Sequence, residues 1–273
     1  MSDRLSRPVG SHARGHELSV DTGEGSGMVQ EHNPLPFADD TSPSVGGAAV
    51  AERILSAISL GLLTVGERLP PEIELAQQFG VAVNTLRKGL SELRDREIVV
   101  TRRGRSGGTF IVRAPFPSPD EVRERLRESS LVDLRDLRDE QVAIGSAIAR
   151  LAAMRAWGTS IERLTTLADR VRRATAPAEA ASADSRFHIE LAVLAQSPRL
   201  LRAEVRIQSE MAALHWMLSD FEQTLSMVAS DHDSVIRAVA ANDGSAAAVA
   251  MSEHLQHDGV RMMDAKLSTD PVL

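Results

Sequence analysis

Cysteine and tyrosine are absent from the 273 residues, and the aromatic residues are limited to six phenylalanines and two tryptophans. Without cysteine there are no disulfides or thiolate metal ligands, which is typical of proteins of the reducing cytoplasm. The sequence also lacks an apolar run of about 18 residues and an N-terminal hydrophobic segment, so we expect neither a membrane span nor a signal peptide. Plentiful alanine and leucine favour packed helices over a β-sandwich. These features predict a cytoplasmic protein rich in helices.

The net charge of −7 is unfavourable for binding to nucleic acid until it is divided along the chain. Residues 48–113 contain ten Arg and Lys against seven Asp and Glu, which is a local charge of +3. The residues before this region sum to −4 and the residues after it sum to −6. Because DNA responds to the local field, the basic region is a candidate DNA-binding domain.

The length of the chain and its 42% apolar content predict two folded domains. Residues 1–47 contain scattered Gly, Ser, Pro and His without apolar periodicity, which predicts a disordered tail. We expect the first domain over residues 48–113 and the second over residues 120–267. Three alternating prolines make residues 114–119 a stiff, extended linker between them.

A pattern of two short helices and a hairpin runs through residues 69–112. Pro70 and Pro71 suit the first turn of a helix, where a missing N–H costs nothing, and Gly80 suits its left-handed end. The apolar residues between them recur at helical spacing: Ile73, Leu75, Ala76 and Phe79. A preceding helix is expected over residues 48–63. Its inward residues are predicted to be Val50, Ile54, Ala57 and Ile58.

The second helix of this pattern is predicted to begin at Asn84 and Thr85. Its buried stripe is expected to be Leu86, Leu90 and Leu93. Residues 98–100 and 109–112 are expected as strands, joined by a basic, glycine-rich turn over residues 102–108. This order is that of a winged helix-turn-helix, whose second helix enters the major groove while the wing contacts phosphates or the minor groove. The candidate DNA-binding residues are Asn84, Thr85, Arg87, Lys88, Arg102, Arg103, Arg105 and Gly107.

These residues resemble the DNA-binding domain of the GntR family of bacterial transcription regulators. The resemblance runs from about Val50 to Val112 and rests on GLLTVGERLPPEIELAQQFGV, NTLRKGLSELRDREIV and the basic wing. The family usually has an arginine where Ile73 and Val83 stand, whereas Arg87 and the wing glycine are retained. The resemblance implies a double-stranded DNA operator as partner, with a sequence outside the family's common operators.

From residue 120 to about 267 the apolar pattern is helical, without strand-like alternation. Helices are expected near residues 119–129, 131–157, 160–174, 182–195, 198–218, 221–241 and 244–267. The breaks between them are placed at Gly158, Pro177, Ser197–Pro198 and Asn242–Gly244. The region therefore predicts an all-α bundle of six or seven helices, and the whole chain a mainly α fold.

One aspartate and one histidine in this bundle share a helix face, because Asp184 and His188 are four residues apart. His232 and His254 lie on the last two expected helices. Three neutral imidazoles and one carboxylate suit a divalent transition metal such as zinc, nickel or manganese. By residue type alone, the same four residues are also explained as surface groups or as histidines satisfied in the core.

The bundle resembles the ligand-binding domain of the FadR branch of GntR regulators. That domain places an Asp-x-x-x-His pair on one helix and a histidine on each of the last two, which implies that the four residues above bind one metal ion. It also implies a small-molecule effector, such as an organic acid. The family's cavity arginine and glutamate fall on Gln141 and Gly145 here, so the effector-binding candidates are Gln141 and Arg138, one turn earlier. His215 and His257 are not assigned to the site.

The two resemblances imply a ligand-responsive DNA-binding regulator, most often a repressor in this family, acting as a homodimer on a two-fold operator. The alternative is a metal-dependent enzyme built on the three-histidine and aspartate site. An enzyme would need a general base or nucleophile beside the metal, and no such motif accompanies the ligands. A further alternative makes the metal purely structural, or lets the effector bind without it.

Overall fold

A computed structural model describes residues 46–156, 158–217 and 220–269 of the chain. These residues form ten helices and one two-stranded sheet, so the predicted mainly α fold is confirmed. The tail expected over residues 1–47 lies outside the described residues, except that the first helix already begins at Gly47. Within the described ranges, no helix is both long and apolar enough to cross a membrane.

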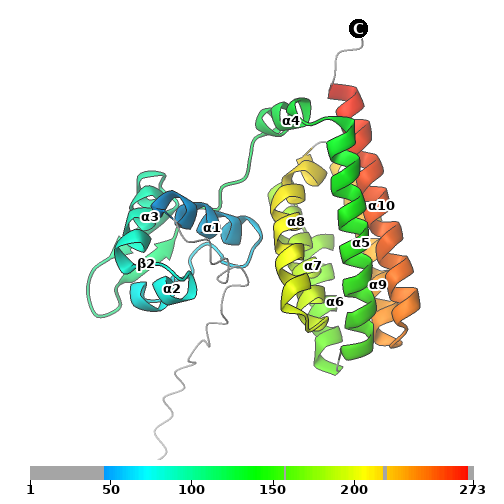
Figure 1. Ribbon diagram of the computed structural model, residues 1–273, viewed down its shortest axis with the longest axis horizontal. Coiled ribbons are helices and arrows are strands. Elements are labelled where there is room, and N and C mark those ends of the chain that lie inside the picture. Colours follow the sequence, from blue (N-terminus) through cyan, green and yellow to red (C-terminus); the bar gives the residue numbers. More distant parts are fainter. Residues whose placement is uncertain (1–45, 157, 218–219, 270–273) are drawn as a thin grey trace, which may run out of the picture. The chain divides into compact units, whose positions relative to one another are not determined.

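The first part of the chain has the order of elements that the sequence predicts (Figure 1). Its elements are α1 (Gly47–Ser59), α2 (Glu72–Gln78), α3 (Val83–Asp95), β1 (Val99–Arg102) and β2 (Gly108–Ile111). The two strands are antiparallel, with Val99 opposite Ile111 and Arg102 opposite Gly108. The expectation that the first strand ends at residue 100 was wrong, because this pairing continues into the predicted turn. A winged helix-turn-helix results.

The apolar faces of these helices pack into one core. The predicted residues that are buried in it are Val50, Ile54, Ala57, Ile58, Leu75, Ala76, Phe79, Leu86, Leu90 and Leu93. Ile73 does not join the core, since its side chain is 67% exposed. At about 100° per residue it points roughly 200° away from Leu75, toward solvent. Gly61 and Gly80, which follow α1 and α2, both have a left-handed backbone conformation. The expectation that the first helix extends to residue 63 was wrong, because α1 ends before Gly61.

The second part of the chain is an all-α bundle, as predicted (Figure 1). Its helices are α4 (Pro119–Glu128), α5 (Leu131–Arg155), α6 (Gly158–Arg172), α7 (Pro177–Leu194), α8 (Pro198–Met217), α9 (Phe221–Ala240) and α10 (Gly244–Thr269). The break expected at Pro177 lies directly before it, over residues 173–176, and the expected helix start at residue 182 was wrong, because Pro177 is the first residue of α7. Proline fits that position, where no helical N–H partner is needed.

The long helices of the bundle are held close together by small side chains. Helix α10 packs along α5, and α7 packs against α6 and α8. Five buried alanines lie at these contacts: Ala149, Ala152, Ala153, Ala192 and Ala247. At Gly145 an added Cβ would lie 2.5 Å from Cδ1 of Leu255, so a larger residue here would require the Leu255 side chain to move. This packing places the inner faces of α7, α9 and α10 around one buried region.

Candidate functional site

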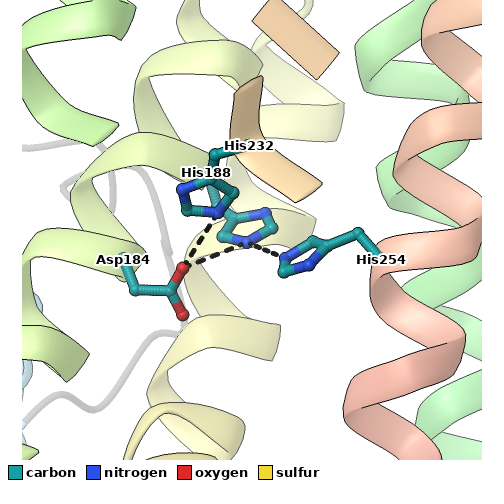
Figure 2. A group of neighbouring side chains, drawn as sticks. All are labelled: Asp184, His188, His232 and His254. Carbon is teal, nitrogen blue, oxygen red and sulfur yellow. Dashed lines mark hydrogen bonds and ion pairs between the residues drawn. The ribbon is translucent and has the colours of Figure 1, made fainter. Parts of the chain in front are cut away.

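Four polar residues from three helices meet in the interior of the bundle (Figure 2). Asp184 and His188 lie one turn apart on α7, His232 lies on α9 and His254 lies on α10. None is more than 5% exposed. Each offers one nitrogen or oxygen atom, and these atoms lie within 4.8 Å of one another. The structure therefore brings together all four of the residues that the sequence suggested as metal ligands.

The donor atoms at the centre of this cluster are closely spaced. Nε2 of His188 lies 3.2 Å from Nε2 of His254 and 3.6 Å from Oδ1 of Asp184. The same oxygen lies 3.2 Å from Nε2 of His232, without the alignment of a hydrogen bond. Atoms bonded to one ion at about 2.0–2.2 Å are separated by distances of this order. The spacing therefore fits a shared metal ion, and the contact between His188 and His254 also has the geometry of a hydrogen bond.

Side chains outside the cluster hold two of the four residues in place. The indole Nε1 of Trp216 donates a hydrogen bond of 3.1 Å to Oδ2 of Asp184, which leaves Oδ1 directed at the histidines. Oδ2 of Asp231 lies 3.4 Å from Nδ1 of His254 and 3.1 Å from Nδ1 of His257. A carboxylate on one ring nitrogen orients a histidine and makes its other nitrogen a better ligand. From the sequence Trp216 was a candidate without an assigned role, and Asp231 was not expected.

The protonation states of Asp184, His188 and His232 also suit metal binding, whereas His254 has to give up a proton to the solvent when a metal binds. Burial lowers the pKa of His188 to about 3 and lowers the pKa of His232 as well. Burial alone would raise the pKa of Asp184, but the neighbouring imidazoles of His232 and His188 outweigh it and hold that pKa well below its usual range. Burial lowers the pKa of His254, but nearby carboxylates, above all Asp258, raise it above its usual value. An ionised carboxylate and neutral imidazoles are the forms that bind a metal.

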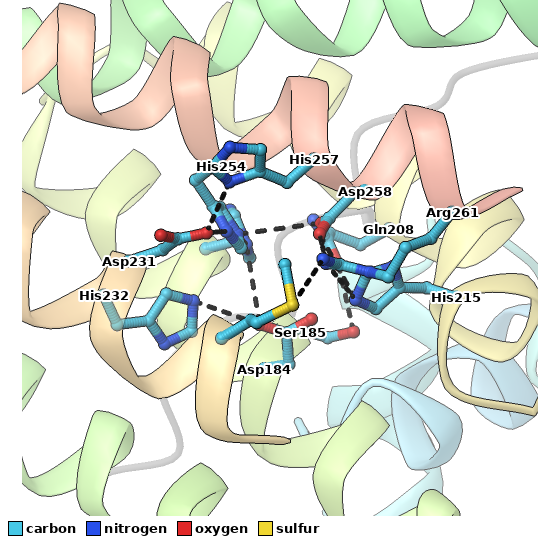
Figure 3. Close-up of polar contacts among 12 residues, drawn as sticks. Asp184, Ser185, Gln208, His215, Asp231, His232, His254, His257, Asp258 and Arg261 are labelled. Carbon is cyan, nitrogen blue, oxygen red and sulfur yellow. Dashed lines mark hydrogen bonds and ion pairs between the residues drawn. The ribbon is translucent and has the colours of Figure 1, made fainter. Parts of the chain in front are cut away.

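A second polar group, made of the buried His215 and Asp258 and the half-buried Arg261, lies beside the cluster (Figure 3). Oδ1 of Asp258 lies 3.3 Å from Nε2 of His215 and accepts a hydrogen bond from Nη2 of Arg261. Oδ2 of Asp258 lies 3.7 Å from Nε2 of His254. His215 had no assigned role from the sequence, and Asp258 and Arg261 were not expected at the site. The available signal was the spacing, because Asp258 follows His254 by four residues, as His188 follows Asp184.

The outer side of His188 faces a third set of polar groups, on α8. Oε1 of Glu204 lies 3.8 Å from Nδ1 of His188 and accepts a hydrogen bond of 2.9 Å from Nε2 of Gln208. The hydroxyl of Ser185 donates in turn to Oε1 of Gln208 at 3.1 Å. Burial raises the pKa of Glu204 to about 7. Glu204 therefore changes charge near neutral pH, inside the bundle.

The two effector-binding candidates on α5 are placed differently. Gln141 is 3% exposed, and its Oε1 has no hydrogen-bond partner within the described part of the chain. The side chain of Arg138 is 27% exposed and donates to Oδ1 of Asp139 at 2.6 Å. Its aliphatic part lies where a Cβ on Gly259 would be. A buried, unpartnered amide suits a ligand contact better than an arginine that is already paired.

The predicted DNA-binding residues lie on α3 and on the wing. The exposed ones are Asn84, Arg87, Lys88, Arg102, Arg103 and Arg105, while Thr85 and Gly107 are half-buried. Nε of Arg87 donates to Oε2 of Glu72 at 2.7 Å. The guanidinium of Arg102 lies 4.7 Å from the centre of the Phe110 ring. A Cβ on Gly107 would lie 2.6 Å from the carbonyl oxygen of Arg102, so this tight wing turn requires glycine.

Two family models match the chain, each over one part of it. The model described as "Bacterial regulatory proteins, gntR family" matches residues 47–111, which contain α1 to α3 and both strands. The model described as "FCD domain" matches residues 136–257, which contain all four residues of the buried cluster. The matches therefore coincide with the winged helix-turn-helix and with the core of the bundle.

Similar proteins are named as transcription regulators. The chain is 45% identical over 240 residues to the HTH-type regulator RmpR of Mycobacterium gastri, covering 86% of this chain and 88% of RmpR. It is 31% identical over 215 residues to an L-lactate dehydrogenase operon regulatory protein of Escherichia coli, covering 76% and 82% of the two chains. The Uxu operon regulator of Haemophilus influenzae is 26% identical over 233 residues, covering 81% and 84%. These extensive similarities show that the chain is a DNA-binding transcription regulator of the GntR family with an FCD domain, and not an enzyme.

Proposed function

We propose that this regulator is a ligand-responsive repressor that binds a two-fold operator as a homodimer. In this proposal residues 48–113 bind DNA, and residues 120–267 bind the effector and form the dimer contacts. The observation that supports it best is that four buried donor atoms meet in the helical bundle. The same chain also contains a winged helix-turn-helix with exposed basic residues. The FCD domain implies an effector in that bundle.

The buried cluster is proposed to hold one divalent transition ion, such as zinc, nickel or manganese. The ligands would be Asp184, His188, His232 and His254. Their burial, their spacing and the ionised state of Asp184 support this set. When bound, such an ion supplies coordination positions to which an oxygen of the effector can bind.

The operator contacts are proposed to come from α3 and the wing. The residues are Asn84, Thr85, Arg87, Lys88, Arg102, Arg103, Arg105 and Gly107. Arg87 suits a guanine edge or a phosphate because its guanidinium offers two parallel donors. In the free protein it is paired with Glu72, so it must leave that exposed contact in order to reach DNA.

The effector is proposed to be a small organic acid bound beside the metal, with Gln141 as a contact and Arg138 as a second candidate. One relative is named for an L-lactate dehydrogenase operon, which supports this chemical class. Gln141 is supported by its burial and by its Oε1, which lacks a hydrogen-bond partner in the described ranges. The effector would shift the regulator between two arrangements by binding one of them more tightly.

The test combines metal content with DNA binding. Wild type, His188→Ala and His254→Ala are dialysed, reloaded with zinc and analysed for metal, with His257→Ala as the control. His257 is half exposed and contacts the cluster only through Asp231, so its variant should keep about one ion per subunit, while the other two lose it. Gel shifts on DNA from around the regulator's own gene should give salt-dependent binding by all four proteins.

Two outcomes would contradict the proposal in different ways. Equal metal content in all four proteins, or none even after reloading, would show that the cluster is an ordinary group of polar core residues. Loss of operator binding in His188→Ala and His254→Ala, with their folding intact, would show that the metal belongs to DNA recognition and not to the effector response.

A further inference from the structure

Besides the four residues of the buried cluster, a further carboxylate on α10, that of Asp258, approaches it. Asp258 is 3% exposed and lies one turn after His254 on the same face of the helix. Figure 3 shows it between His254 and the side chains of Arg261 and His215. A buried carboxylate is costly unless its charge is balanced, so its position requires an explanation.

One distance brings an oxygen of Asp258 close to a donor atom of the cluster. Nδ1 of His254 faces Asp231, so Nε2 of His254 is the nitrogen directed at the cluster. Oδ2 of Asp258 lies 3.7 Å from this Nε2. The corresponding separation between Asp184 and His188 is 3.6 Å. Two atoms bonded to one ion at about 2.1 Å can be at most about 4.2 Å apart, so each pair by itself is close enough to share an ion. Asp258 is outside the group of donor atoms that lie within 4.8 Å of one another, so its side chain has to move toward the ion in order to bind it.

The two oxygens of Asp258 have different surroundings. Oδ1 faces Nε2 of His215 and the guanidinium of Arg261, which together neutralise and orient it. Oδ2 points the other way, toward His254. The ion pair with Arg261 explains the position of Oδ1. It does not explain why Oδ2 lies close to Nε2 of His254, which is a proposed metal ligand.

We propose that Asp258 is a fifth ligand of the metal ion, and this inference rests on the metal site proposed above. Asp184 and Asp258 together would balance the charge of a divalent ion that three neutral imidazoles leave uncompensated. The ion would then have fewer positions open to the effector. An oxygen of the effector has to compete with Oδ2 of Asp258, whose other oxygen remains held by Arg261 and His215.

The experiment uses cobalt(II) as the probe in the full-length protein. The visible absorption of protein-bound cobalt weakens as its coordination number rises from four to five or six, so the spectrum reports the number of ligands. Wild type should show the weak bands of a five- or six-coordinate ion. Asp258→Asn, which keeps the size of the side chain but is a poor ligand, should show stronger bands and lose at least about 10-fold in cobalt affinity.

Arg261→Gln is the matched control, because it breaks the ion pair while it leaves the Asp258 carboxylate in place. Its cobalt spectrum should stay that of wild type. Strong four-coordinate bands in wild type, or an Asp258→Asn spectrum and affinity equal to those of wild type, would overturn the role of Asp258 while leaving the four-ligand site intact. Strong four-coordinate bands in wild type would exclude Asp258 as a fifth ligand even if Asp258→Asn does not fold. No cobalt binding by wild type would instead overturn the metal site itself.

Discussion

Glu204 offers a quantitative test of the buried polar groups around the cluster. It is 2% exposed on α8, and Oε1 accepts a hydrogen bond from Gln208. Within the chain as described, its Oε2 has no hydrogen-bond partner. Burial raises the pKa of Glu204 from its ordinary 4.5 to about 7. The folded protein therefore holds this proton more tightly than the unfolded chain does.

The sign and size of the effect follow from linkage. A carboxyl with a raised pKa stabilises the fold fully below pH 4.5, and this stabilisation is lost as the pH rises through about 7. One pKa unit corresponds to about 1.4 kcal/mol. Between pH 5 and pH 8.5 the wild type should therefore lose about 2–3 kcal/mol of unfolding free energy through Glu204 alone. Glu204→Gln has the same shape and no charge to bury, so it should not show this loss.

The assay is urea unfolding of the metal-free protein, kept in chelator, at pH 5 and pH 8.5. The difference in unfolding free energy between Glu204→Gln and wild type should shift by about 2–3 kcal/mol in favour of the variant at the higher pH. Glu210→Gln is the control, because Glu210 lies on the same helix but is exposed and paired with Arg206. A difference that stays constant with pH, or that favours wild type at pH 8.5, would refute the burial of a titrating carboxyl at this position.

Three further predictions concern the DNA-binding part. Arg87→Ala should weaken operator binding by about 1–3 kcal/mol in a gel shift at physiological salt, and unchanged affinity would contradict the assignment of α3 as the recognition helix. Replacing Arg102, Arg103 and Arg105 with alanine should weaken binding to all DNA sequences and flatten its salt dependence, whereas a loss confined to the operator would mean that they read bases. Gly107→Ala should weaken binding with little loss of thermal stability, because its Cβ would displace the exposed wing backbone; wild-type affinity would show that the turn tolerates a side chain.

Local signals were sufficient to predict the winged helix-turn-helix. Helix positions follow from apolar spacing, and their ends follow from residues with special backbone preferences, such as Gly80. The stripe of Leu86, Leu90 and Leu93 is buried as expected. The close pairing of Asp184 with His188 is also local, because four residues make one helical turn.

The errors in the sequence analysis arose where one local signal has two interpretations. Proline both ends helices and begins them, and at Pro177 it begins one. An isoleucine near a helix start was counted with the apolar stripe, but Ile73 faces solvent. The wing strand continues to Arg102 because strand pairing across the hairpin overrides the turn preference of a glycine-rich segment.

The sequence by itself determined the helical and winged elements and the i, i+4 pair, because these depend on residues close together in the chain. Only the tertiary structure decided what surrounds the pair. Trp216, Glu204, Asp231 and Asp258 come from three other helices, and each reaches the cluster through the packing of α7 to α10. No periodicity encodes such contacts, since they depend on the angle and the register at which whole helices meet.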